Sequence, residues 1–387
     1  SILKACSLVG SLEIGEDINA EIRKKGLLEK DVVIGNALVD MYSKCGVLDK
    51  AQEVFMELSV RDVVSWTALI TGYAQHGLGD EALKLFQEMK DVGVCPNVIT
   101  YIYVLKACGI VGSLEIGEEI DAKIREQGLV EKNVILGTAL VDMYSKCGAM
   151  EKAQEVFAEL PEQNIMSWNT LITGYAGQDQ PEEALHYFEQ MRSEGFSATA
   201  ATFVCTLKAC GNIGAAVKGR KLHADIMRKG LEMNLIVGST LVDMYAKCGL
   251  LVKADDVLEE LPIRNVVSWN ALISGYAEQG QCHEALNCLE RMCNEGVSPD
   301  EVTFLCILSA CSHAKLLEET QTLLLNMKGI YGVTPNIEHY TCMVDIFGRA
   351  GHIDKAVTAI KKMPCSDYPP VWAALLGACR KWGNMDL

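Results

Sequence analysis

Apolar residues recur along the chain with helical spacing, in pairs of segments separated by a glycine. The segment 138–157, TALVDMYSKCGAMEKAQEVF, has an apolar-periodic stretch, then Gly148, then a second amphipathic stretch. Apolar positions three or four residues apart predict a helix, and a glycine after the last of them predicts its end. The segment therefore predicts two helices that pack against each other as a hairpin.

This pattern occurs four times. Its copies start at Asn36, Thr138, Ser239 and Thr341, which are 102, 101 and 102 residues apart. Two other hairpin patterns lie between the copies. One carries a tryptophan, at 64–89, 166–191 and 267–292, and the other a Lys-Ala-Cys or Ser-Ala-Cys, at 2–22, 104–124, 206–226 and 307–327. The chain is therefore a tandem array of three hairpin types.

Short polar joints divide the array into units. The predicted units are 32–62, 63–97, 98–133, 134–164, 165–199, 200–234, 235–265, 266–300, 301–336 and 337–367, with a truncated unit at 1–31 and the start of another at 368–387. Period-2 alternation persists nowhere, so no strand is predicted. Stacked hairpins need no single central core. The predicted fold is an all-α, right-handed α-solenoid superhelix of about eleven helix-turn-helix repeats.

Composition narrows the class of protein. The 387 residues are 49% hydrophobic, and no run of 18 apolar residues predicts a membrane span. No signal or transit peptide is recognisable. Because the chain begins inside one repeat and stops inside another, we expect a fragment, and a missing targeting segment means nothing.

Sixteen cysteines raise the question of a metal or disulfide protein. They recur at fixed repeat positions, without a CxxC pair or an HExxH motif. One position holds Cys45, Cys147 and Cys248, and another holds Cys6, Cys108, Cys210 and Cys311. This placement predicts small buried hydrophobic residues in a reducing compartment, and neither a metal nor another cofactor.

The unit lengths of 35, 31 and 36 residues, with VSWNALISGYAEQG, LVDMYAKCG and VLKAC in fixed order, resemble the pentatricopeptide repeat (PPR) family. The resemblance is to its plant PLS subclass, which alternates standard (P), long (L) and short (S) motifs. It assigns S to 32–62, 134–164 and 235–265, P to 63–97, 165–199 and 266–300, and L to 98–133, 200–234 and the partial 1–31. It assigns the closing variants L2 and S2 to 301–336 and 337–367. PPVWAALLGACRKWGN, within 368–387, resembles the start of an E1-like extension. A tetratricopeptide scaffold is the rival, but its single 34-residue length and tryptophan pattern are not found.

The resemblance implies that the fifth and last residues of each unit together read one RNA base. In S and P units these positions are always Asn, Asp, Thr or Ser. The pairs are Asn36/Asp62, Thr67/Asn97, Thr138/Asn164, Asn169/Thr199, Ser239/Asn265, Asn270/Asp300 and Thr341/Asp367. Helix capping is the alternative interpretation, because caps favour the same residue types.

Hydrogen-bond chemistry turns these pairs into a predicted RNA sequence. The ring N–H of uracil or guanine suits the acceptor Asp, and the bare ring nitrogen of adenine or cytosine suits the donor amide of Asn. Thr or Ser at the fifth position leaves room for a purine, whereas Asn suits a pyrimidine. Long units have apolar fifth residues, at Ile102, Val204 and Leu305, and are expected to be spacers or weak readers. The prediction, 5′ to 3′, is U-A-n-A-Y-n-A-U-n-G.

The second residue of each unit is expected to flank the bases as an apolar plate. These residues are Val33, Val64, Ile99, Ile135, Met166, Ile236, Val267 and Val302, with Ala201 and Glu338 as departures. Core packing is the alternative role.

Phosphate binding needs cations, yet the formal net charge is −16. The candidates stand at position 13 of the short units: Lys44, Lys146, Lys247 and Arg349. Cations that stabilise a helix C-terminus would stand at the same place. Because acids gather in predicted second helices, such as 151–163, we expect most negative charge on the convex side and a weak, salt-sensitive affinity.

The motif order resembles organellar C-to-U RNA editing factors of the mitochondrion or chloroplast. Such factors often end in a DYW-type zinc deaminase with an HxE…PCxxC signature, which this chain lacks. The prediction is thus a monomeric, non-enzymatic module that binds single-stranded RNA and no membrane. Its expected partners are a deaminase in cis or in trans and an accessory editing protein on the long repeats. The alternatives are an organellar RNA stability or splicing factor and a TPR-like protein-binding scaffold.

Overall fold

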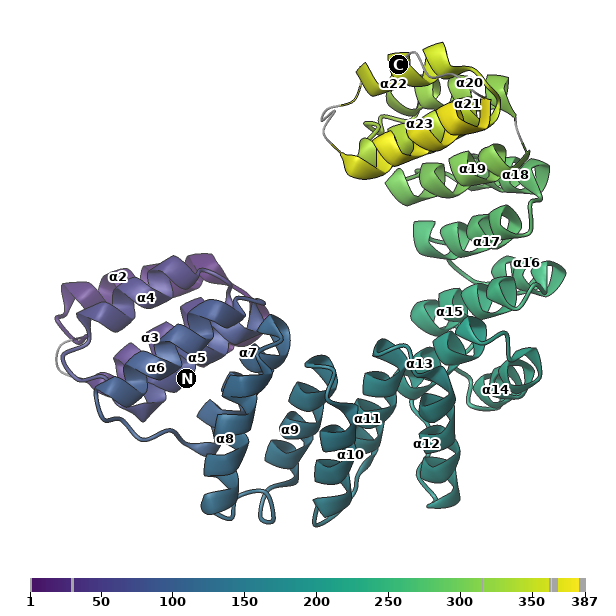
Figure 1. The fold of residues 1–387 in the computed structure, drawn as a ribbon. Helices are drawn as coiled ribbons and strands as arrows, with labels where there is room; N and C mark the ends of the chain where they lie inside the picture. The colour runs from purple at the N-terminus through teal and green to yellow at the C-terminus, as the bar shows by residue number, and fades with distance from the viewer. Residues whose placement is uncertain (1, 29–30, 315, 362, 364–367, 383–387) are drawn as a thin grey trace. The chain divides into compact units, whose positions relative to one another are not determined.

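The computed structural model describes residues 2–28, 31–314, 316–361, 363 and 368–382. Within these ranges all regular structure is helical, which confirms the all-α prediction (Figure 1). The chain divides into two compact bodies, which are described separately: an N-terminal body, 1–197, and a C-terminal body, 198–387.

The described residues of the N-terminal body form twelve helices. They are α1 (Ile2–Val9), α2 (Leu12–Lys24), α3 (Val32–Lys44), α4 (Leu48–Glu57), α5 (Val63–Gln75), α6 (Gly79–Asp91), α7 (Val98–Val111), α8 (Leu114–Glu126), α9 (Val134–Lys146), α10 (Met150–Glu159), α11 (Ile165–Gly177) and α12 (Pro181–Ser193). The C-terminal body continues the alternation. Its helices are α13 (Ala200–Asn212), α14 (Ala216–Arg228), α15 (Leu235–Lys247), α16 (Leu251–Glu260), α17 (Val266–Glu278), α18 (Cys282–Asn294), α19 (Glu301–Ala314), α20 (Leu317–Gly329), α21 (Ile337–Arg349), α22 (Ile353–Lys361) and α23 (Pro369–Trp382).

Consecutive helices form hairpins, and the hairpins stack within each body. The odd-numbered helices, here called first helices, pack against one another in chain order: α3 on α5 on α7 on α9, and α15 on α17 on α19 on α21. Each first helix also packs against the even-numbered second helix that follows it, as α3 does on α4 and α15 on α16. Each body therefore has a layer of first helices, which carries the predicted reading positions.

First and second helices begin in different ways. Most first helices start at a side-chain cap, such as Asp31 for α3 and Asn133 for α9. The second helices of the short units follow a glycine with positive φ, such as Gly46 at 77° and Gly148 at 79°. Glycine reaches this conformation without a steric penalty, so it permits the tight turn between the two helices.

Aromatic packing fills the space between neighbouring hairpins. The rings of Phe55 and Trp66 meet edge to face with centroids 4.7 Å apart, and Phe157 and Trp168 repeat the contact at 4.7 Å. In the third copy the phenylalanine is replaced by Leu258. There the guanidinium of Arg291 lies 5.1 Å from the ring centroid of Trp269 instead.

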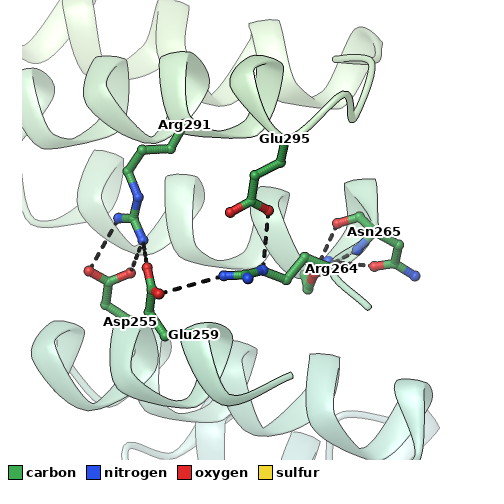
Figure 2. A network of polar contacts seen from close by, with 7 residues as sticks. Asp255, Glu259, Arg264, Asn265, Arg291 and Glu295 are labelled. Carbon is green, nitrogen blue, oxygen red and sulfur yellow. Dashed lines mark hydrogen bonds and ion pairs between the residues drawn. The ribbon is translucent and has the colours of Figure 1, made fainter. Parts of the chain in front are cut away.

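Figure 2 shows the polar network around that arginine, which is built from second helices and the loop after them. Arg291 pairs with Asp255 and Glu259 at 2.9 and 2.5 Å. Arg264 pairs with Glu259 at 3.6 Å and with Glu295 at 3.1 Å. Acidic and basic groups of α16, the loop after it and α18 thus neutralise one another between neighbouring repeats.

The cysteines divide by position, as their recurrence predicts. Cys6, Cys108, Cys210 and Cys311 are buried, which confirms the prediction for this set. Burial raises the pKa of the Cys108 thiol to about 12, so it is protonated and unreactive at neutral pH. Cys45, Cys147 and Cys248 are only half-buried, contrary to expectation, because they stand at the ends of their helices.

Over the part of the chain that the structure describes, no helix has the length and hydropathy to cross a bilayer.

Small residues let first helices approach closely. A Cβ added at Gly174 on α11 would lie 2.7 Å from Cβ and 2.5 Å from Oγ of Ser145 on α9. A Cβ added at Gly177, at the end of the same helix, meets nothing within 4 Å. We predict that Gly174→Ala lowers the free energy of unfolding by about 1–3 kcal/mol through overpacking. Gly177→Ala, the matched control, should raise it by up to about 1 kcal/mol through helix propensity. Urea unfolding of both variants tests this, and equal stabilisation by the two would contradict it.

Candidate nucleic-acid interface

The last residue of a unit caps the first helix of the next one. Oδ1 of Asp62 accepts the backbone N–H groups of Val64 and Ser65 at 3.0 and 2.9 Å, at the start of α5. The same role falls to Asn97, Asn164, Thr199, Asn265 and Asp300. Asp367 lies outside the described residues. The described last residues therefore do cap helices, and base reading by the same residues stays a prediction.

The fifth residues do not cap. They lie on the first helices, and their hydroxyls donate to the backbone carbonyl four residues earlier: Thr67 to Val63 at 2.6 Å and Thr138 to Val134 at 2.8 Å. Ser239 and Thr341 donate in the same way. With the proton so engaged, each hydroxyl oxygen offers a further partner only an acceptor.

The structure brings fifth and last residues together. Nδ2 of Asn36 donates to Oδ1 of Asp62 at 3.0 Å, across 26 residues of sequence. Nδ2 of Asn270 donates to Oδ1 of Asp300 at 2.9 Å, across 30 residues. Each fifth residue of these two pairs thus faces the cap of the next helix.

The other pairs are joined less directly. Thr100 Oγ1 connects Thr67, at 2.7 Å, with Asn97 Oδ1, at 3.1 Å. Among the described contacts, no hydrogen bond joins the members of the pairs Thr138/Asn164 and Ser239/Asn265. Asn169 belongs to the N-terminal body, on α11, and Thr199 to the C-terminal body.

Both paired carboxylates are ionised at neutral pH. Partial burial acts to raise the pKa of Asp62, but hydrogen bonds from Ser65 and Asn36 outweigh it, and the pKa is lowered. The same balance lowers the pKa of Asp300, with Thr303 and Asn270 as donors. The hydrogen bonds measured above fall on Oδ1, and Oδ2 takes part in none of them. Oδ2 is therefore the oxygen suited to accept a donor from outside the chain.

The second residues are exposed apolar side chains. Their exposed fractions are 73% for Val33, 52% for Val64, 54% for Ile99, 62% for Ile135, 62% for Met166, 67% for Ile236, 59% for Val267 and 51% for Val302. Core packing, the alternative role, is thus wrong for all eight. Ala201 and Glu338 are exposed as well. Because the second and fifth residues are three apart on one helix, each apolar side chain lies beside its unit's fifth residue.

The four candidate phosphate-binding cations are all engaged in ion pairs. Each pairs with an aspartate one turn earlier on the same first helix: Lys44 with Asp40 at 2.7 Å, Lys146 with Asp142 at 2.7 Å, Lys247 with Asp243 at 3.0 Å and Arg349 with Asp345 at 2.8 Å. The acids of the described helices do lie mainly on second helices, as expected, for example on α8 and α16. The first helices of the short units nevertheless carry an aspartate beside each candidate cation. Exposed ion pairs of this kind are weak, so a cation can leave its aspartate for another anion such as a phosphate. Because each cation lies beside an aspartate, however, the net positive charge at these positions is small.

Sequence reasoning missed Thr100 and Thr303, the third residues of two long units. Both are completely buried and contact the predicted reading pair of the preceding unit. Their signal in the sequence was a Ser or Thr at the third position of every standard and long unit from 63 onward.

The stacked hairpins define a helical repeat protein in which each unit adds one pair of helices to the array. The sequence profile of the PPR repeat family matches residues 61–109, 163–212 and 264–313, and that of the PPR repeat matches 36–63, 138–165, 239–266 and 338–368. The chain belongs to the pentatricopeptide repeat family.

Curated relatives from Arabidopsis thaliana cover all of this chain. A mitochondrial pentatricopeptide repeat-containing protein is 36% identical over 385 residues, and the chloroplastic protein CRR2 is 38% identical over 392 residues. The chain spans 69% and 59% of their lengths. Maize PPR10 in complex with an 18-nt psaJ RNA element has the same fold, with a TM-score of 0.61 at 18% identity, over 99% of this chain and 66% of PPR10.

The pKa of Asp62 makes its contribution to stability depend on pH. Because the folded-state pKa lies below the unfolded value of about 3.9, the stabilisation is complete above that pH. It is lost as the pH falls through the folded-state pKa. We predict that Asp62→Asn, which does not titrate, is less stable than the wild type at pH 7, and that the difference shrinks at pH 3. Urea unfolding at both pH values measures it. A difference independent of pH would show that ionised Asp62 adds nothing to the fold.

Proposed function

We propose that the chain binds single-stranded RNA, one base per repeat, as the site-recognition module of an organellar C-to-U RNA editing factor. One observation carries the proposal. The fifth residue of one unit and the last residue of the same unit, far apart in sequence, meet at Asn36/Asp62 and again at Asn270/Asp300. Exposed apolar side chains at Val33 and Val267 flank these two pairs.

The Asn/Asp pair suits uracil. Asn270 gives one Nδ2 hydrogen to Asp300 and keeps the second for a carbonyl oxygen of the base. Oδ2 of Asp300 accepts the ring N–H of uracil, which cytosine and adenine lack. The apolar second residues stack on base faces, a contact that every base can make.

Assigning one base to each unit, beginning with unit 32–62, gives the RNA sequence U-A-n-A-Y-n-A-U-n-G. Units with Thr or Ser at the fifth position and Asn at the last take adenine, and Thr341 with Asp367 takes guanine. The half-buried Ile102, Val204 and Leu305 make the long units weak readers or docking sites for an accessory editing protein.

The relatives support an organellar role. Curated relatives are named mitochondrial or chloroplastic, and maize PPR10 is described in complex with RNA. We place this chain in one of these organelles, in the PLS subclass, with a deaminase supplied in cis or in trans. The chain itself contributes binding and no chemistry.

Two other functions share this fold. An organellar RNA stability or splicing factor would bind the same RNA without directing deamination. A protein-binding scaffold would use the apolar long units and leave RNA unbound.

The test is electrophoretic mobility shift with UAUAUUAUUG, which obeys the register, at low and moderate salt. We predict that replacing the eighth base, U, by A weakens binding by about tenfold, the effect of about 1.4 kcal/mol at one base. The double variant Asn270→Thr with Asp300→Asn should reverse that preference. Asp300→Asn keeps a residue type that caps helices, and threonine already stands at the fifth position of other units, at Thr67 and Thr138, so folding should be preserved.

The second base of the RNA serves as the control. The predicted preference of the protein for A at this position depends on Thr67 and Asn97, so the double variant should leave that preference unchanged. Equal binding of all RNAs, or a preference that does not move with the two residues, would contradict one-base reading. Absence of RNA binding would favour the protein scaffold.

A further inference from the structure

The third residue of each standard and long unit from 63 onward carries a hydroxyl that is buried near the start of its first helix. These residues are Ser65, Thr100, Ser167, Thr202, Ser268 and Thr303, and each is 0–1% exposed. The corresponding residues of the short units 32–62, 134–164 and 235–265 are Ile34, Leu136 and Val237. Because a buried hydroxyl without a partner is costly, the recurrence calls for a defined hydrogen bond at each site.

Among the described contacts, the hydroxyls of the serines hydrogen-bond only to the cap residue. Ser268 Oγ donates to the backbone oxygen of Asn265 at 2.9 Å and accepts the N–H of Asn265 at 3.1 Å. Ser65 and Ser167 donate to the backbone oxygens of Asp62 and Asn164 at 2.8 and 2.9 Å. In these copies the hydroxyl completes the start of the helix and makes no described contact with the fifth residue.

Two of the threonines, Thr303 and Thr100, also contact the fifth residue of the preceding unit. Thr303 Oγ1 lies 2.6 Å from Oδ1 of Asn270 and 2.9 Å from Oδ1 of Asp300, and it accepts the Asp300 N–H at 3.1 Å. Its proton therefore holds the amide oxygen of Asn270, while Asp300 holds the amide nitrogen. With both ends of the amide engaged, Nδ2 and Oδ1 cannot exchange places.

The short-unit pair Asn36/Asp62 lacks this contact. Oδ1 of Asn36 is buried and has no hydrogen-bond partner among the described residues. The third residue of the next unit is Ser65, and its hydroxyl contacts Asp62 instead of Asn36. Thr100 repeats the threonine arrangement, with Oγ1 contacts at 2.7 Å to Thr67 and 3.1 Å to Oδ1 of Asn97.

We propose that Thr303 and Thr100 are positioning residues that fix the base-facing atoms of the preceding standard unit, so that the base preference of a standard repeat depends on the third residue of the long repeat after it. This inference rests on the proposed reading of bases by Asn270/Asp300 and Thr67/Asn97. It gives the long repeats a role in recognition even though their own fifth residues are apolar.

The test compares Thr303→Val with Ser268→Ala in RNA binding. Thr303→Val keeps the shape and removes the hydroxyl, and we expect the ratio of affinities for U over the other bases at the eighth position to fall about fivefold, the effect of one hydrogen bond. Ser268→Ala removes a buried capping hydroxyl without touching a fifth residue. It should leave the preference for A at the seventh position unchanged. The thermal midpoints of both variants show whether they lose similar stability.

The outcomes separate this inference from the proposed function. If the wild-type chain shows no base preference, the proposed function fails. If the wild type is selective and Thr303→Val remains equally selective, the positioning role is wrong. If both variants lose selectivity in proportion to lost stability, the hydroxyls serve folding alone, which also overturns the inference.

Discussion

The side-chain cap at the start of most first helices is the interaction on which the rest of the structure depends. The side chain of Asp62 satisfies two N–H groups that would otherwise lack a partner, and it also stands in the recognition pair with Asn36. Under the proposed function, Oδ1 serves the fold and Oδ2 accepts a hydrogen bond from the base. That double role restricts the position to residues that cap helices, and it makes the proposed recognition a property of the junction between two repeats.

Charge sets the character of the proposed binding. The overall charge is −16, and each position-13 cation is paired with an aspartate of its own helix. Phosphate attraction is therefore weak. Affinity must come from stacking on the exposed second residues and from hydrogen bonds to base edges, which are the contacts that carry sequence information. A module of this kind gains selectivity at the expense of strength.

The sequence was sufficient for the all-α fold, because helical periodicity and turn glycines such as Gly148 repeat in register. It could not separate capping from base reading, because Asn and Asp serve both and only the structure shows which oxygen is engaged. Nor could it tell whether Val33 or Ile236 is core or surface, since apolar residues near a helix start serve either role. The ion pair of Lys44 with Asp40 could be predicted from the sequence, because residues four apart on a helix lie on the same face. The contact of Thr303 with Asn270, across 33 residues, required the register between neighbouring first helices.

The most direct measurement is hydrogen–deuterium exchange with and without UAUAUUAUUG. If RNA lies along the starts of the first helices, exchange should slow in segments 62–67, 265–270 and 300–305, whose amides are held by the caps Asp62, Asn265 and Asp300. Second helices such as α4 and α18 should be unaffected. Protection confined to the second helices, with RNA bound, would contradict the account.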